Sequence, residues 1–230
     1  MLFSRLQTYL SMLRTDPAGF LLYILMYALA ILLSLILHEC AHGLVALWCG
    51  DPTAKMMGRL TLDPRRHLDP IGTVSMVLLG IGWARPVPVN PNRFRHYRRD
   101  DIFVSLAGIV TNLLLFALST LFLVLQIRLS PDSRSWNSLM QALQEFLILM
   151  ARINVSLAVF NLLPIPPLDG YHVLNDIILR GRLQLNRNTF QIAQVVLIVL
   201  CLSGALSGIL STANNWLYQG MLNLWISLLF

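Results

Sequence analysis

The stretch LSLILHECAHGLVALW, residues 33–48, places His38, Glu39 and His42 inside a run that is otherwise almost entirely apolar. The eighteen residues 20–37 carry no charge, and the apolar pattern continues to residue 48, so the segment exceeds the ~20 residues that a helix needs to cross a bilayer. It is too long for a signal peptide and lacks a small-residue cleavage site, so we expect a permanent membrane span. Ionisable groups at that depth are costly without partners and therefore indicate a functional site.

The composition of the whole chain agrees with a membrane location. Of the 230 residues, 56% are apolar and 12% are charged, well below the charged fraction of a soluble domain. We therefore expect an all-α polytopic membrane protein, a helical bundle in the lipid bilayer. The net charge of +6 comes mostly from loop arginines without interleaved aromatic residues, which indicates contact with the membrane surface and no nucleic-acid partner. The three cysteines form no CxxC pair and predict no disulfide framework.

The rest of the chain divides into apolar stretches separated by polar loops. An amphipathic helix in the membrane interface is predicted within residues 1–17, ahead of a break at Asp16-Pro17. We treat the chain as one domain, 1–230, whose catalytic core comprises 20–163 and 164–180. Further spans are expected at 102–127 and 139–163, with a polar turn at 129–137 between them, and C-terminal transmembrane helices are expected within 191–230, at 192–209 and 216–230.

The polar region after the first span is expected to hold two unusual features. Residues 71–82 are too few to cross a bilayer and contain three glycines, so they should enter the membrane and return as a re-entrant loop. Residues 59–62 alternate like a strand between Asp-Pro turns, which predicts a small membrane-associated β-sheet.

The basic residues predict which side of the membrane the loops occupy. Nine of the seventeen lie within 51–101 and three more within 180–187, and both groups fall on one face only if 71–82 re-enters. Because short cytoplasmic loops collect Lys and Arg, we place these loops and the nearby site toward the cytoplasm, with the N-terminus outside. Gly204 and Gly208 have GxxxG spacing, which suits close helix packing or a homo-oligomer through the C-terminal helices.

The H-E-x-x-H pattern of residues 38–42 has a direct chemical interpretation. On a helix, side chains at i and i+4 point in nearly the same direction, so His38 and His42 can bind one ion while Glu39 holds a water beside it. The alternative is a pair of core histidines bonded to backbone carbonyls. A zinc ion would offset the cost of placing these groups in hydrocarbon.

Two histidines leave zinc short of a protein ligand, because catalytic sites usually supply three. Most other acids precede a proline or lie in polar loops, whereas Asp169 in NLLPIPPLDG follows an apolar span. Its alternative role is a helix N-cap. Pro164, Pro166 and Pro167 force an extended backbone there, which at membrane depth is tolerated only in protein or beside a cavity. His172, three residues further on, could support the site as a partner behind the ligands.

Four motifs together resemble the site-2 protease family of intramembrane zinc metalloproteases, in its compact form without a PDZ domain. They are HECAH at 38–42, GWARPVPVNP at 82–91, Gly108 to Asn112, and NLLPIPPLDG at 161–170. The resemblance covers about residues 30–175 and implies one zinc per chain held by His38, His42 and Asp169. It also implies Glu39 as general base and a membrane-spanning protein as substrate. Ile109 departs from the proline of many relatives, which weakens the match around Asn112.

The developing oxyanion needs a donor besides the metal. Asn112, Asn154 and Asn161 are candidates because amides deep in spans are costly without partners, and interhelical hydrogen bonding would explain each of them equally well. For substrate binding we consider residues 83–90, where Pro86 and Pro88 fall on one edge of a strand and the amides of Arg85, Val87 and Val89 on the other. That edge would pair with an unwound substrate, or else within the protein's own sheet.

Two competing functions use the same features. A zinc-binding membrane transporter should show more ionisable residues over several spans and internal repeats, neither of which the sequence contains. A catalytically inactive membrane scaffold is the other alternative to an enzyme. Hydrolysis of a lipid amide or ester would use the same zinc chemistry, and only the family resemblance favours a peptide bond.

Overall fold

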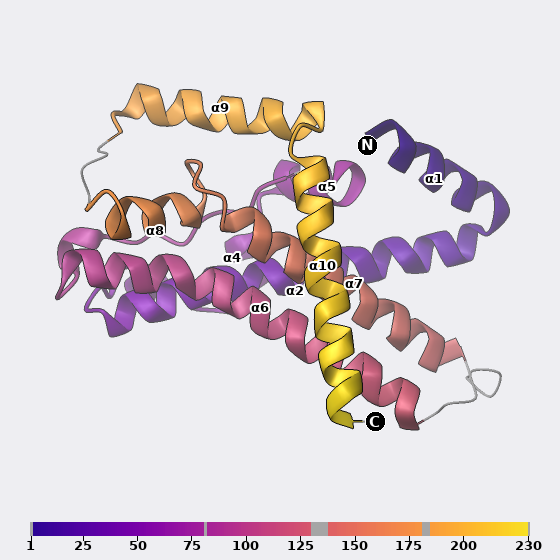
Figure 1. Cartoon of the computed structure of the whole chain (residues 1–230). Coiled ribbons are helices and arrows are strands. Elements are labelled where there is room, and N and C mark those ends of the chain that lie inside the picture. The colour runs from indigo at the N-terminus through magenta and orange to yellow at the C-terminus, as the bar shows by residue number, and fades with distance from the viewer. Residues whose placement is uncertain (1, 81, 130–137, 181–184, 230) are drawn as a thin grey trace.

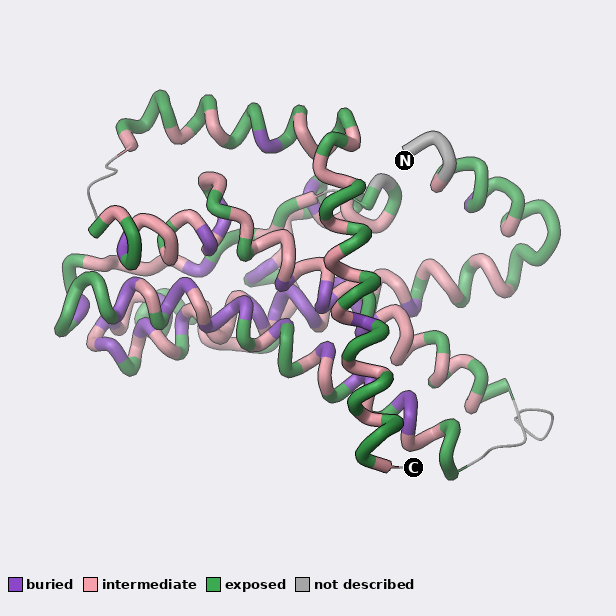
Figure 2. The backbone as a smooth tube through the Cα atoms, viewed as in Figure 1, coloured by how far each residue is buried: buried purple, intermediate pink, exposed green. Residues whose placement is uncertain are grey.

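The computed structural model describes residues 2–80, 82–129, 138–180 and 185–229, and its core is a bundle of three long helices (Figure 1). These are α2 (Pro17–Trp48), α6 (Tyr97–Leu129) and α7 (Ser138–Asn161), and each is long and apolar enough to cross a membrane. The buried side chains lie mainly along α2 and α6 (Figure 2). The prediction of a multi-pass helical bundle is therefore confirmed. The expected polar turn at 129–137 lies almost entirely outside the described residues.

The N-terminal helix folds back onto the first span. Asp16 caps α2 by accepting a bond from Gly19 N at 3.0 Å, which separates α2 from α1 (Leu2–Thr15). Tyr9 of α1 is buried against Phe20 and Tyr23 of α2, with ring centroids 5.8 and 6.3 Å apart, and its hydroxyl donates to Val77 O at 3.2 Å. The predicted helix and its break are present, and its placement in the membrane interface stays a prediction.

Residues 70–84 leave the bundle and return to it. Asp69 caps α5 (Pro70–Leu79), and Gly80, with φ of 79°, ends the helix in the left-handed conformation that glycine tolerates best. The chain then runs back along α5, where a Cβ on Gly72 would lie 2.2 Å from Trp83 O. The out-and-back course matches the expected re-entrant loop, and its insertion into a bilayer stays a prediction.

The prediction of a small β-sheet in this region is wrong for the described part of the chain. One isolated antiparallel bridge, between Leu68 and Ala84, is what forms there. The Asp-Pro pairs start short helices, α4 (Pro64–His67) and α5, because each aspartate caps the helix whose first residue is the proline. Residues 59–62 form bends after α3 (Thr53–Met56), and Pro86 and Pro88 have no N–H to give a ladder.

The C-terminal region is a bent pair of helices and not two separate spans. Helices α9 (Arg187–Ser203) and α10 (Ser207–Leu229) meet at 76°, and only as a pair are they long and apolar enough to cross. Gly204 has φ of 77° and ends α9, whereas a Cβ on Gly208 would meet no atom within 4 Å. The GxxxG spacing therefore marks a helix end here and no close packing within the chain. Formation of an oligomer stays a prediction.

Helix α10 packs across the bundle while α9 remains largely exposed (Figures 1 and 2). Tyr218 of α10 is buried beside Phe116 with ring centroids 6.4 Å apart, and Trp225 Nε1 donates to Thr120 Oγ1 at 3.1 Å. On α9, Leu197 is the buried side chain among those described.

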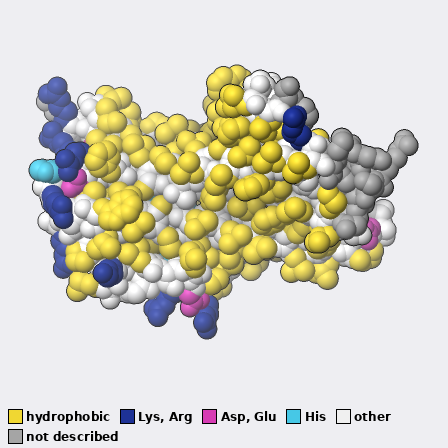
Figure 3. Space-filling model, turned by 90° about the horizontal axis from the view of Figure 1, so that it is seen from below, with side chains coloured by type: hydrophobic (Ala, Val, Ile, Leu, Met, Phe, Trp, Pro, Cys, Tyr) yellow, Lys and Arg dark blue, Asp and Glu magenta, His cyan; other side chains and the backbone are white. Residues whose placement is uncertain are grey.

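Basic side chains gather at one end of the molecule (Figure 3). In Figure 1 this is the end at which the N-terminal part of α6 and the short helix α8 (Asp169–Ile177) lie. The 3-10 turn η1 (Pro91–Arg93) leads into this end of α6. That both basic regions face one side of a membrane stays a prediction, and Arg182 lies outside the described residues.

Candidate metal centre

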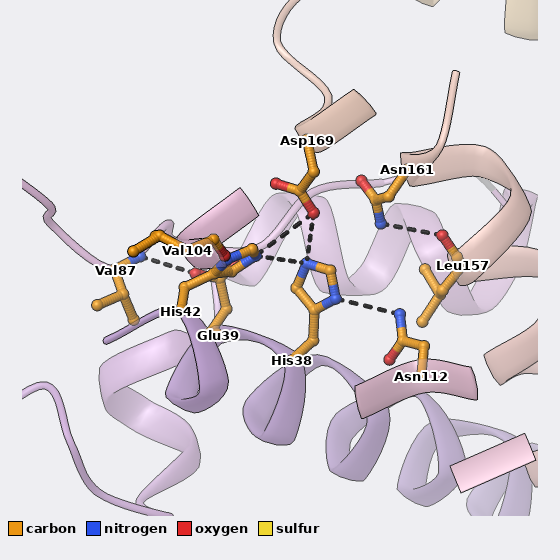
Figure 4. A network of polar contacts seen from close by, with 9 residues as sticks. All are labelled: His38, Glu39, His42, Val87, Val104, Asn112, Leu157, Asn161 and Asp169. Atoms are coloured by element: carbon orange, nitrogen blue, oxygen red, sulfur yellow. Dashed lines mark hydrogen bonds and ion pairs between the residues drawn. The ribbon is translucent and has the colours of Figure 1, made fainter. Parts of the chain in front are cut away.

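His38, His42 and Asp169 come together between α2 and the start of α8 (Figure 4). The Nε2 atoms of the two histidines are 3.0 Å apart, and Asp169 Oδ2 lies 3.5 Å from His38 Nε2 and 3.4 Å from His42 Nε2. His38 is 6% exposed. The one-turn spacing on α2 aligns the two rings, as the sequence predicts. Within the described ranges, this is the one group of three His, Cys, Asp or Glu side chains close enough to hold a metal.

The other ring nitrogen of each histidine has a partner that leaves Nε2 free. His42 Nδ1 lies 2.7 Å from Val104 O, to which it donates, so the proton of a neutral ring is on Nδ1. His38 Nδ1 lies 3.1 Å from Asn112 Nδ2, while Asn112 Oδ1 is buried without a hydrogen-bond partner among the described residues. Amide O and N are assigned from the surrounding network. With the amide turned over, Asn112 Oδ1 accepts from His38 Nδ1–H, and both rings carry the same tautomer.

In this arrangement three acceptor atoms point at one another. Asp169 Oδ2 is buried and makes no hydrogen bond within the described chain, and two unprotonated ring nitrogens repel when they face each other. A cation between them satisfies all three atoms, and imidazole with carboxylate is a donor set that zinc accepts. The residues present therefore fit a zinc ion held by three protein ligands.

Gly108 of α6 allows the two rings to lie where they do. A Cβ at this position would be 2.4 Å from His38 Cε1 and 2.5 Å from His42 Nε2, far inside van der Waals contact. Val104, Gly108 and Asn112 are one turn apart, so a single face of α6 supports both histidines. The sequence motif contains Gly108 and Asn112, and the four-residue spacing was the signal from which this shared face could have been predicted.

Glu39 is held by a segment that lies against α2 and is not part of the helix bundle. We name residues 84–90 the strap. Its Val87 N–H donates to Glu39 Oε2 at 2.7 Å (Figure 4), and Val87 itself is 7% exposed. At the far end of the strap, Asn90 N–H donates to the buried Asp51 carboxylate at 2.6 Å. Asp51 also accepts from Thr53 and so does more than form the turn expected of it.

The strap does not offer the free edge that the sequence predicts. The Arg85 N–H donates to His67 O at 2.8 Å, and the Val87 N–H is bonded to Glu39. On its carbonyl side, Arg59 Nη2 donates to Arg85 O at 2.8 Å and to Pro86 O at 3.2 Å. Pairing of Arg85, Val87 and Val89 with a substrate stays a prediction, and it requires two of these amides to exchange partners.

The three asparagines have different places. Asn112 lies behind His38 and not beside the space between the ligands. Asn154 is fully buried and donates to Ser34 Oγ of α2 at 2.9 Å, which joins α7 to α2, and to Met150 O one turn back in α7 at 2.8 Å. Its oxyanion role stays a prediction, and it would require the amide to exchange one of these two partners. Asn161 donates to Leu157 O at 3.1 Å and lies beside Asp169 in Figure 4, so it remains the candidate donor.

His172 supports α8 and not a metal ligand directly. Its Nδ1 lies 3.4 Å from Asp101 Oδ2 of α6, and this carboxylate raises the pKa of His172 above its usual value despite partial burial. The sequence predicted only a supporting role and gave no sign of Asp101 as the partner.

Comparisons with known proteins indicate a family of metalloproteases. The profile of Peptidase family M50 matches residues 132–204. The chain is 42% identical over 153 residues to a Bacillus subtilis (strain 168) protein named "Putative zinc metalloprotease YwhC", a match that covers 66% of this chain and 69% of that protein. It is 32% identical over 193 residues to "Putative zinc metalloprotease Rip2" of Mycobacterium tuberculosis (strain ATCC 25618 / H37Rv), covering 82% and 71% of the two chains. No solved structure matches significantly.

Proposed function

The chain belongs to peptidase family M50, the site-2 proteases, and is a zinc metalloprotease; from this premise we propose that it hydrolyses a peptide bond within or near a transmembrane segment of another membrane protein. The observation that carries the proposal is the position of the three candidate ligands. His38 and His42 lie within a helix long and apolar enough to span the bilayer, more than one turn inside its C-terminal end at Trp48. A substrate that reaches them must itself enter the membrane.

His38, His42 and Asp169 would hold the zinc, which supplies an activated water with a pKa near ~7. Glu39 would take one proton of the water as the water oxygen bonds to the substrate carbonyl carbon, and would deliver that proton to the leaving nitrogen as the C–N bond breaks, so that no amide anion is released. The Val87 N–H fixes one oxygen of the Glu39 carboxylate at 2.7 Å. This bond orients the other oxygen and keeps the buried carboxylate from being unpaired.

A transmembrane helix hides its amides in i to i−4 bonds, so it must open before a carbonyl can be attacked. The strap is the extended backbone beside Glu39, and strand addition of a substrate there would require it to displace the present partners of Arg85 and Val87. A substrate carbonyl that pairs with Val87 N–H would replace Glu39 as acceptor. The Val87 N–H would then exchange its bond to Glu39 for a bond to the substrate, so that binding of the substrate releases the general base.

Charge supports a cytoplasmic position for the end of the molecule that carries both basic loops (Figure 3). The exposed Asn92 lies in this region. In oriented vesicles, a cysteine introduced by Asn92→Cys should react with an impermeant thiol reagent from the cytoplasmic side. Labelling from the outer side alone would reverse the proposed orientation.

The substitution Glu39→Gln tests the proposal, because the glutamate serves the water and not the ion. The purified variant, reconstituted with a transmembrane substrate, should retain about one zinc per chain and lose cleavage by a factor of roughly 10²–10⁴. Comparing membrane proteomes of cells that carry the native and variant enzymes should show spans that accumulate uncut. If Glu39→Gln cleaves at the native rate, Glu39 is not the base; if only soluble peptides are cut by the native enzyme, the membrane substrate is wrong.

A further inference from the structure

The third candidate ligand depends on how α8 is attached. Asp169 is the first residue of this nine-residue helix, and its capping residue, Leu168, makes no side-chain bond to the helix N-terminus. Gly170 presses the start of α8 against the preceding loop, since a Cβ there would lie 2.3 Å from Leu162 O. Residues 162–168 form turns and bends and no regular helix. The attachment of α8 to α6 therefore decides where the Asp169 carboxylate lies.

A cluster of ionisable side chains lies at this attachment. Asp169, His172 and Asp176 are spaced by three and four residues and share one face of α8. His172 Nδ1 contacts Asp101 Oδ2 of α6 at 3.4 Å, and the Asp176 carboxyl is hydrogen-bonded to the same Asp101 side chain. Asp101 and Asp176 are 9% and 6% exposed, whereas His172 is half-exposed. Two buried carboxyl groups thus lie together, and one of them, Asp101, also contacts the imidazole.

The cluster has a preferred protonation state. Two carboxylates this close repel, and a proton on one of them turns the repulsion into a hydrogen bond. Burial and the neighbouring Asp101 raise the pKa of Asp176 to about 6, although His172 and Arg98 oppose the shift. The other titratable groups nearby are Tyr97 and Tyr171, and burial raises the pKa of Tyr171 above its usual value.

We propose that Asp101, His172 and Asp176 form a clamp that docks α8 on α6 and thereby positions Asp169 against His38 and His42. All three are positioning residues, because none of them reaches the space between the ligands. The inference rests on the proposed zinc centre. A carboxyl whose pKa is raised on docking favours the docked helix at low pH. This advantage is lost as the pH rises from about 4, the ordinary value, through about 6.

Zinc affinity is the direct measurement, made by chelator competition on the purified holoenzyme without substrate. Asp101→Ala should weaken zinc binding about tenfold, within the range of losses seen when groups behind metal ligands are removed. Asp101→Asn should recover most of the affinity, because its amide oxygen can still accept from His172. The matched control is Ile177→Ala, an exposed position of the same helix, which should bind zinc like the native protein.

The second variant, Asp176→Asn, mimics the protonated carboxyl and keeps its shape. Its zinc affinity relative to the native protein should rise between about pH 4, the ordinary pKa of the group, and about pH 6, and level off above it. The clamp is excluded if Asp101→Ala binds zinc normally or if the Asp176→Asn ratio is flat with pH. Both readouts are independent of substrate, so a failure of the proposed membrane substrate leaves them unchanged, and a failure of the clamp leaves Glu39→Gln unaffected.

Discussion

The strap and helix α8 reach the histidines of α2 in different ways. The strap is tied along its length through its backbone, by Val87 N–H on Glu39 and Asn90 N–H on Asp51. Helix α8 has two side-chain attachments to α6 near its middle and end, at His172 and Asp176. One segment therefore holds the proposed general base, and the other holds the proposed third ligand. Because the two attachments share no residue, substitutions should separate metal binding from cleavage.

The largest loss of zinc binding and cleavage is expected from a substitution of Asp169, the ligand that α8 supplies. Asp169→Ala removes the third donor, so zinc binding should weaken more than the 10–100-fold typical of losses behind the ligands, and cleavage should disappear with it. Zinc content after dialysis against chelator measures this. An unchanged zinc content would mean that another side chain supplies the third ligand.

A substitution in the strap should reduce cleavage and leave zinc binding intact. Val87→Pro deletes the N–H that Glu39 accepts, so we expect cleavage of a helical substrate to fall roughly a hundredfold while zinc content stays at one per chain. Val87→Ala keeps the amide and is the control. Native turnover by Val87→Pro would show that neither Glu39 nor the substrate needs this bond.

Substitutions of Asn112 test whether the face of α6 that supports the histidines affects zinc binding, as helix α8 should. Asn112→Leu leaves His38 Nδ1 without its partner and should weaken zinc binding by about 10–100-fold. Asn112→Asp should bind zinc well, since a carboxylate accepts from Nδ1–H, and this outcome also reports the orientation of the native amide. Equal losses in both variants would contradict the assigned tautomer.

The smallest effect is expected at the outer end of the strap. Burial alone would raise the pKa of Asp51, but the bonds from Asn90 and Thr53 outweigh it and bring that pKa below its usual value. Such a group stabilises the fold above its ordinary pKa of about 4 and loses this contribution as the pH falls through the lower, folded value. Asp51→Asn should therefore loosen the strap at neutral pH by about 1 kcal/mol and abolish the acid dependence. Hydrogen exchange of residues 82–92 measures both.

The sequence predicts those parts of the site that lie within one helix or one motif. His38, Glu39 and His42 follow from a one-turn spacing, and Asp169 from its place after an apolar span and three prolines. The contacts of Glu39 with Val87 and of His172 with Asp101 join elements far apart in the chain, so no local pattern encodes them. The β-sheet prediction is wrong because Asp63-Pro64 and Asp69-Pro70 start capped helices, and the alternation at 59–62 is too short to form a strand beside them.

The 76° bend between α9 and α10 determines where the end of the chain emerges. Three helices are long and apolar enough to cross by themselves, and the bent pair would add a fourth crossing only if both halves act as one span. With three crossings the two termini lie in different compartments, and with four they lie in the same one. The conformation of residues 204–206 thus decides whether the number of membrane crossings is odd or even. A compartment-sensitive reporter can be fused after Phe230 and, in a second protein, before Met1. Equal signals would mean that both termini lie in one compartment, and different signals would mean that they lie in two.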